Sequence, residues 1–183
     1  MTEGRRLSPD ERRSVLGFVR SVLSAACHGQ TGPEAPDVPL LAEPGACFVT
    51  LREGNSVRGC IGSVEAFEPL AENLRRNAEN AAFSDPAFPP LEADELAFTT
   101  IEVALPAPPR RLASPEEPDL ERDGLLIVSG SRRAVFLPGT VAEQRWTLPE
   151  AWEQLALKAG LPPDAWRDPA TGLYAFECEI FAE

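Results

Sequence analysis

The residues with the clearest chemical potential lie in the segment 57–62, Val-Arg-Gly-Cys-Ile-Gly, which we call the signature segment. Cys60 supplies a thiol, and Arg58 supplies a guanidinium two positions before it. Side chains of a β-strand alternate between its faces, so we expect Arg58 and Cys60 to project together. A guanidinium beside a thiol favours the thiolate and lowers the pKa of the cysteine. The segment therefore predicts an activated cysteine nucleophile.

A structural interpretation fits the same segment. Gly59 and Gly62 leave room for the close approach of a backbone or of a ligand. A buried cysteine in a strand loosened by glycines, with Arg58 paired to an acidic residue, would need these same residue types, because buried free cysteines are common. The residue types leave both interpretations open.

A cysteine nucleophile needs a group that accepts its proton. The single histidine, His28, lies at the predicted end of the first helix, where a water-facing ring that complements the helix dipole is its ordinary role. Asp85 and Glu102 are the carboxylates that could accept the proton or pair with Arg58. Both also have ordinary roles, because Asp85 precedes a proline as turn formers do and Glu102 lies on the polar face of a predicted strand.

The remaining cysteines, Cys27, Cys47 and Cys178, are predicted to act as small hydrophobic residues in a reducing environment. The four cysteines are widely spaced and there is one histidine, so the ligand spacing of zinc and iron–sulfur sites is absent and we expect no cofactor. Phosphate-loop, dinucleotide, serine-hydrolase and zinc-protease motifs are also absent, which disfavours those chemistries.

Short elements must position these side chains. Ser8-Pro9-Asp10-Glu11 predicts the capped start of a helix that ends near His28. The other predicted elements are strands over 46–51 and 57–63, a helix that opens at 69 and ends before 84, strands over 98–105, 125–128 and 134–137, a helix from 147 to 160, and a closing strand over 174–180. Hairpins dominate and βαβ alternation is lacking, so we predict an α+β fold with a largely antiparallel sheet flanked by helices.

Composition narrows the class of protein further. The chain has 183 residues, of which 43% are hydrophobic and 25% charged, and this predicts one globular domain over residues 8–183 after an N-terminal tail of residues 1–7. No apolar run approaches the roughly 18 residues of a membrane span, and the first residues are charged, so we expect a cytoplasmic protein without a signal peptide. The net charge of -12 disfavours binding to nucleic acid or to an anionic membrane.

Several separated blocks of the chain resemble the AMMECR domain family, labelled in bacteria AmmeMemoRadiSam system protein A. The blocks are 47–51, 57–62, 85–90, 101–103, 132–138 and 158–161. The resemblance covers roughly residues 8–183. Two places depart from the family pattern: Gly139-Thr140-Val141 follows Pro138 where glutamine and valine are usual, and Ala87 stands where arginine is common. Family ligand contacts at those places are not carried over.

The resemblance implies a two-lobed α+β fold, with an antiparallel sheet in the larger lobe and helices and short strands in the smaller. It also implies association with a Memo-like protein and a radical-SAM protein in a modification pathway. This chain lacks the radical-SAM cysteine cluster, so it would not generate the radical. We expect either a thiol-dependent enzyme component or a non-catalytic adaptor for those partners or their substrate. The predicted site consists of Cys60 as candidate catalytic residue and Arg58, Gly59, Gly62, Asp85 and Glu102 as candidate binding residues.

Overall fold

Helix α1 (Pro9–Cys27) begins at the capping box that the sequence predicts. In the computed structural model, which describes residues 6–183, the Ser8 hydroxyl accepts from the Glu11 N–H and the Glu11 carboxylate accepts from the Ser8 N–H. Leu7, assigned above to the tail, is buried in the core, and its N–H donates to Glu179. A lone leucine among charged residues gives no periodic signal that could have placed it there. Residues 1–5 of the predicted tail lie outside the described residues.

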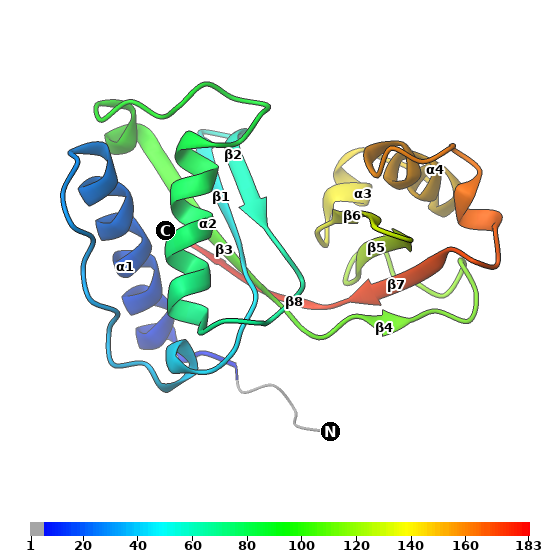
Figure 1. Cartoon of the computed structure of the whole chain (residues 1–183), viewed down its shortest axis with the longest axis horizontal. Coiled ribbons are helices and arrows are strands. Elements are labelled where there is room, and N and C mark those ends of the chain that lie inside the picture. The colour runs from blue at the N-terminus through cyan, green and yellow to red at the C-terminus, as the bar shows by residue number, and fades with distance from the viewer. Residues whose placement is uncertain (1–5) are drawn as a thin grey trace. The chain divides into compact units, whose positions relative to one another are not determined.

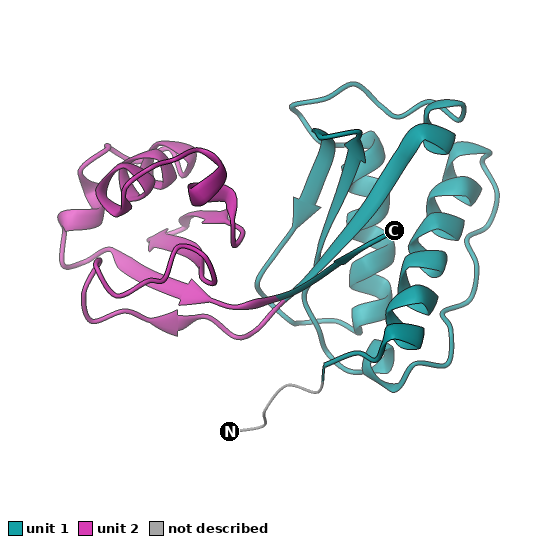
Figure 2. Cartoon of the chain, turned by 180° about the vertical axis from the view of Figure 1, so that it is seen from behind, with its two compact units in different colours: residues 1–105, 179–183 teal, residues 106–178 magenta. Residues whose placement is uncertain are grey.

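The described chain forms two compact units, each with its own four-stranded sheet (Figure 2). Unit 2 is the continuous segment 106–178, and unit 1 comprises the residues before it together with 179–183. The predicted α+β class, with an antiparallel sheet, flanking helices and a smaller second lobe, is confirmed, and the smaller lobe has a four-stranded sheet of its own. No helix of residues 6–183 is long and apolar enough to cross a bilayer.

Unit 1 is a layer of helices on a sheet (Figure 1). Its elements are α1, the 3-10 turns η1 (Pro39–Ala42) and η2 (Glu95–Phe98), helix α2 (Leu70–Phe83), and strands β1 (Phe48–Glu53), β2 (Ser56–Gly62), β3 (Thr99–Pro106) and β8 (Cys178–Ala182). The strand order is β2-β1-β3-β8, and β1 is antiparallel to both β2 and β3. Strand β2 is therefore an edge strand.

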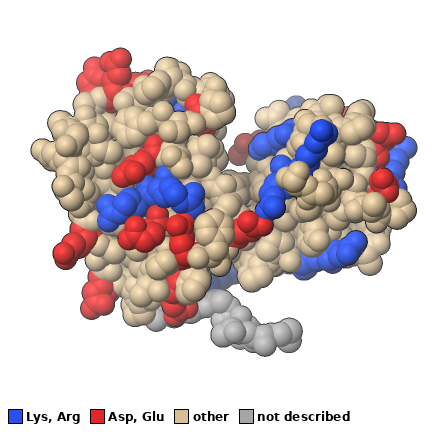
Figure 3. All heavy atoms as spheres, in the orientation of Figure 1, with Lys and Arg blue, Asp and Glu red and all other residues tan. Residues whose placement is uncertain are grey.

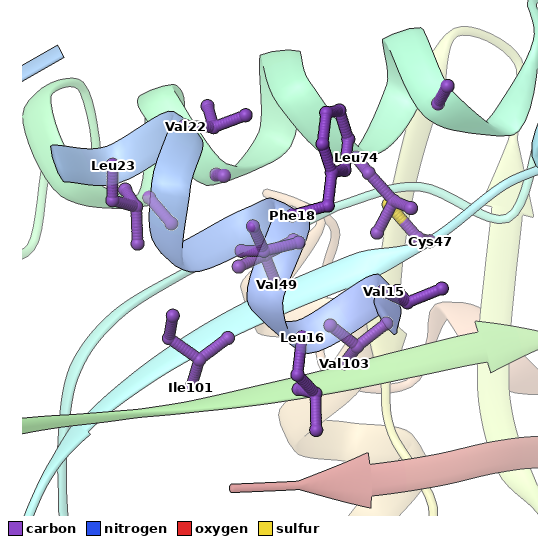
Figure 4. Close-up of a cluster of buried hydrophobic side chains, with 14 of the residues drawn as sticks. Val15, Leu16, Phe18, Val22, Leu23, Cys47, Val49, Leu74, Ile101 and Val103 are labelled. Atoms are coloured by element: carbon purple, nitrogen blue, oxygen red, sulfur yellow. The ribbon is translucent and has the colours of Figure 1, made fainter. Parts of the chain in front are cut away.

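Both long helices of unit 1 lie against the same face of this sheet. Figure 4 shows Val15 and Leu16 of α1 close to Val103 and Ile101 of β3, and the helix α2 contributes Leu74 to the same cluster. Seen from behind, in Figure 2, the strands stand in front of the helices. Within the described part of unit 1, no helix covers the opposite face (Figure 2), which we call the helix-free face and which carries Thr50.

Unit 2 repeats this layering on a smaller scale. Its elements are strands β4 (Arg110–Arg111), β5 (Gly124–Ser129), β6 (Arg132–Phe136) and β7 (Gly172–Phe176), helices α3 (Thr140–Glu143) and α4 (Leu148–Lys158), and the 3-10 turn η3 (Ala165–Arg167). The strand order is β4-β7-β5-β6. Trp152 of α4 is fully buried, and its indole N–H donates to the Pro115 carbonyl oxygen at 2.9 Å.

The closing strand differs from the prediction. Its alternation predicts one strand with Tyr174, Phe176, Cys178 and Ile180 on one face. The chain instead changes sheets at Glu177, with β7 in unit 2 and β8 in unit 1, and Phe181 is the residue that enters the unit 1 core. A pattern of period two shows which side chains share a face, but it does not show which strands lie alongside, so it cannot reveal a change of sheet.

Candidate functional site

Three side chains from three strands form one row across the sheet of unit 1. Thr50 of β1 lies opposite Cys60 of β2 on one side and opposite Glu102 of β3 on the other. The next residues along the strands, Leu51 and Ile101, are fully buried in the core under the helices. Because neighbouring residues point to opposite faces, the row of Cys60, Thr50 and Glu102 belongs to the helix-free face. The sequence singled out Cys60 and Glu102 but missed Thr50 between them.

Cys60 is half-buried and is held by both its backbone and its side chain. Its N–H donates to Oδ2 of Asp85 at 2.8 Å, and its Sγ accepts from Oγ1 of Thr50 at 3.2 Å. Since its N–H points away from β1, Cys60 and Thr50 form a non-hydrogen-bonded pair of the antiparallel ladder. In such a pair the Cα atoms are only about 4.5 Å apart and the side chains are closest. The geometry explains why the hydroxyl reaches the sulfur.

Asp85 combines a turn role with a contact to the signature segment. Its Oδ1 accepts from the Ala87 N–H at 2.9 Å, which forms the Asx turn expected of an aspartate before proline. Its Oδ2 accepts from Cys60, as described above. The carboxylate therefore fastens the turn that follows α2 to the free edge of β2.

Arg58 occupies a β-bulge. The pairing of β1 with β2 shifts register after Leu51, so that Gly59 faces Leu51 while Val57 faces Arg52, and Arg58 is the extra residue. A bulge resets the alternation of side chains along its strand. The expectation that Arg58 and Cys60 project together rests on uninterrupted alternation, and the bulge breaks that premise.

The Arg58 guanidinium fastens a proline-rich loop. Its Nε and Nη2 each donate to one carboxylate oxygen of Glu95 at 3.0 Å, and its Nη1 and Nη2 donate to the carbonyl oxygens of Pro89 and Pro90. The Arg58 side chain is only 11% exposed. The Arg58 hydrogen bonds, and then the Glu92 N–H, hold the pKa of the Glu95 carboxyl below its usual value. The sequence offered Asp85 and Glu102 as acidic partners, and no local pattern pointed to Glu95.

Gly59 and Gly62 admit neighbouring backbone. A Cβ at Gly59 would overlap the carbonyl oxygen of Ala81 on α2. A Cβ at Gly62 would overlap the carbonyl oxygen of Cys47 and the Cα of Phe48. Of the two uses that the sequence leaves open for these glycines, the structure shows the close approach of backbone.

Glu102 pairs with a basic residue of its own sheet face. Its carboxylate lies 3.3 Å from Nε of Arg52, and both side chains remain partly exposed. The pair thus lies on the helix-free face, with Thr50 between Glu102 and Cys60. Glu102 is therefore paired with Arg52, whereas Arg58 is paired with Glu95.

The other cysteines and the histidine have local explanations. Burial raises the pKa of both Cys47 and Cys178 to about 12. Burial, and to a smaller extent the charge of Glu95, raises the pKa of Cys27. His28 is exposed at the end of α1, and its Nδ1 lies 2.7 Å from the Ser24 carbonyl oxygen. Each of these three thiols therefore favours its protonated form.

A buried amide network behind the signature segment was not predicted. Oδ1 of Asn73 accepts from the Cys47 N–H at 3.0 Å, and Nδ2 of Asn77 donates to the Cys47 carbonyl oxygen at 3.1 Å. Nδ2 of Asn73 donates to Glu68, whose pKa is lowered first by hydrogen bonds from Arg76. The spacing of the two asparagines, one helical turn apart beside the leucine and alanine face of α2, was the available signal. The network fixes the backbone against which Gly62 packs.

The charged side chains of unit 1 lie beside side chains of opposite sign (Figure 3). On the face of unit 1 seen in Figure 3, basic atoms are bordered by acidic atoms. The ion pairs of unit 1 include Arg76 with Glu68. Within residues 6–183, no group of three or more histidine, cysteine, aspartate or glutamate side chains is arranged to hold a metal ion.

Known proteins resemble this chain over most of its length. The sequence model of the AMMECR1 family matches residues 16–181. A protein of Methanothermobacter thermautotrophicus is 37% identical over 97% of this chain and 96% of its own length, and protein TK0174 of Thermococcus kodakarensis is 38% identical over 94% and 86%. The crystal structure of uncharacterized protein PH0010 from Pyrococcus horikoshii superposes with a TM-score of 0.87 at 32% identity, covering 92% of this chain and 89% of that one.

Proposed function

Because this chain belongs to the AMMECR1 family, we propose that it is the thiol-bearing component of a modification pathway, with Cys60 as its nucleophile. The proposed partners are a Memo-like protein and a radical-SAM protein, as the family resemblance implies. The site is the row of Cys60, Thr50 and Glu102 on the helix-free face of unit 1.

The single observation that carries this proposal is the environment of the Cys60 sulfur. Cys60 is only half-buried, and a hydroxyl donor lies 3.2 Å from its Sγ. A hydrogen bond donated to sulfur favours the thiolate, which is the reactive form of cysteine. In contrast, the pKa of each of the other thiols, Cys27, Cys47 and Cys178, is raised by burial.

In the proposed step the thiol first loses its proton, and the Cys60 thiolate then attacks an electrophilic carbon of the substrate. A sulfur–carbon bond forms while the leaving group departs with its electron pair. Solvent water takes the proton, because Cys60 is only half-buried and Thr50 separates it from Glu102 in the row. Glu102, held by its ion pair with Arg52, is proposed to contact the substrate on this face of the sheet.

Alkylation tests the nucleophile directly. The intact protein is treated with iodoacetamide over a range of pH, and each cysteine is followed by peptide mass spectrometry. We expect Cys60 to react much faster than Cys27 near neutral pH, with an apparent pKa below the roughly 8.5 of a free thiol. Cys60→Ser is the control that identifies the signal. If Cys60 reacts no faster than Cys27, the proposal fails.

A specific observation favours an adaptor as the second candidate. Arg58, Gly59 and Gly62 are all used to hold the loop or to admit backbone, so the signature segment shapes a surface. In this alternative that surface binds the partners or their substrate without chemistry. Complex formation with the Memo-like and radical-SAM partners, measured by calorimetry, should then persist in Cys60→Ser. The lack of any complex with either partner would reject this alternative.

A further inference from the structure

We infer that Thr50 is the positioning residue that holds the Cys60 sulfur and stabilises its thiolate. This inference rests on the proposed function, because it concerns the same thiol. It assigns a role to a residue that neither the composition of the signature segment nor its spacing brings to notice. The argument comes from register, burial and the chemistry of the hydroxyl group.

Register brings the two side chains together and keeps them there. Thr50 and Cys60 face each other in the ladder of β1 and β2, in the pair type with the shortest side-chain separation. The Cys60 backbone is fixed by its hydrogen bond to Asp85, and β1 is fixed by β3 on its other side. A β-branched threonine has few χ1 rotamers, so its hydroxyl stays where the strand places it.

Burial strengthens the interaction between the Thr50 hydroxyl and the Cys60 sulfur. Thr50 is only 3% exposed, although it lies on the helix-free face. A hydrogen-bond donor that is already oriented beside a developing negative charge does not have to reorganise when the charge appears. Because the donor is shielded from water, its interaction with the thiolate is also less screened than at an open surface. We therefore expect Thr50 to favour the charged form of Cys60 over the thiol.

The hydroxyl can be removed with little change of shape. Thr50→Val exchanges the hydroxyl for a methyl group and keeps the β-branch, and Thr50→Ala removes both. We expect each variant to raise the apparent pKa of Cys60 alkylation by about one unit, which slows its alkylation near neutral pH about tenfold. Thr50→Ser retains a hydroxyl and should restore most of the wild-type rate. Far-UV circular dichroism establishes that each variant is folded.

Thr100→Val is the matched control. Thr100 lies on the same face of the same sheet, but its register partner on β1 is Arg52 instead of Thr50. The same chemical change at Thr100 should leave the pH profile of Cys60 unmoved. The inference is overturned if Thr50→Val and Thr50→Ala keep the wild-type profile, or if Thr100→Val shifts it equally.

The inference and the proposed function can fail separately. The proposed function is judged by the rate of Cys60 relative to Cys27 in the wild-type protein. The inference is judged by the difference in apparent pKa between the wild-type protein and Thr50→Val. A fast Cys60 with no such difference rejects the role of Thr50 alone, whereas a slow Cys60 rejects the nucleophile.

Discussion

At the scale of single residues, Gly59 shows why the signature segment has its composition. Its Cα faces the carbonyl oxygen of Ala81 so closely that no side chain fits between the strand and helix α2. The neighbouring Arg58 reaches away to Glu95 and the loop. Gly59 and Arg58, two of the residues that suggest thiol chemistry, are therefore also needed for packing and for holding the loop. Cys60 is the residue of the segment whose side-chain contact, with Thr50, bears on chemistry.

Gly59→Ala tests this packing role. The obstructing atom is backbone and cannot rotate aside, so we expect a loss of stability of roughly 1–3 kcal/mol, the usual cost of overpacking. Gly17→Ala is the matched control, because a Cβ at this glycine of α1 meets nothing within 4 Å. It should stabilise the protein by roughly 0.5–1 kcal/mol through helix propensity. Urea unfolding of both variants measures the two effects, and equal shifts would contradict the packing argument.

At the scale of elements, the segment between α2 and η2 is attached to β2 by two carboxylates. Asp85 holds its beginning at the Cys60 N–H, and Glu95 holds its end through Arg58. Both attachments involve an edge strand, which would otherwise present unpaired backbone groups. The loop is thus built into unit 1 by side chains far apart in sequence.

A fall in pH should weaken the ion pair of Glu95 with Arg58, which holds the end of this loop. The pKa of Glu95 is lowered in the folded protein, chiefly by Arg58, so the ion pair contributes stability above the ordinary carboxyl value of 4.5. That contribution is lost as the pH falls through the lowered folded value. We expect the protection factors of the amide protons in residues 86–95 against hydrogen exchange to fall in this acid range. In Glu95→Gln these protection factors should already be lower at neutral pH and should lose this pH dependence. An unchanged acid response in Glu95→Gln would contradict the assignment to Glu95.

The buried asparagines of α2 make a second prediction at this scale. Asn73→Ala leaves the buried Cys47 N–H without its acceptor, so we expect a loss of roughly 1–3 kcal/mol. Asn80→Ala, on the same helix but only partly buried, is the control and should change stability little. Chemical denaturation of the two variants decides the point. Equal stabilities would show that the network contributes nothing.

At the scale of the whole molecule, each unit has its own hydrophobic core. All three tryptophans, Trp146, Trp152 and Trp166, belong to unit 2. The two longest helices, α1 and α2, belong to unit 1. Tryptophan fluorescence therefore reports on unit 2, while far-UV circular dichroism reports mainly on unit 1.

This division allows the two cores to be tested separately. Leu155→Ala opens a cavity among fully buried residues of unit 2, and we expect a cost of about 2–5 kcal/mol. The unfolding midpoint followed by tryptophan fluorescence should fall more than the midpoint followed by circular dichroism. Leu74→Ala, in the unit 1 core, should do the reverse. Identical shifts of both signals in both variants would show instead that the two cores unfold as one.

Local patterns were enough for most elements and for the fold class. The capping box at Ser8, the helix that follows it and the neighbouring strands over 46–51 and 57–63 are predictions from short-range signals that the structure confirms. The position of Cys60 on a strand of a hairpin was predictable for the same reason. Leu7, β4 and the change of sheet at Glu177 were not predicted, because each depends on neighbours far along the chain.

The sequence by itself determined which chemical groups are available and on which elements they lie. Cys60 and Glu102 could be named as candidates from their residue types alone. Only the tertiary structure decided their partners: Thr50 beside Cys60, Arg52 beside Glu102, and Glu95 in the fork of Arg58. Strand alternation describes one strand at a time. Pairing between distant segments sets the register of β1 with β2, the bulge at Arg58 and the contact of Arg58 with Glu95, 37 residues away.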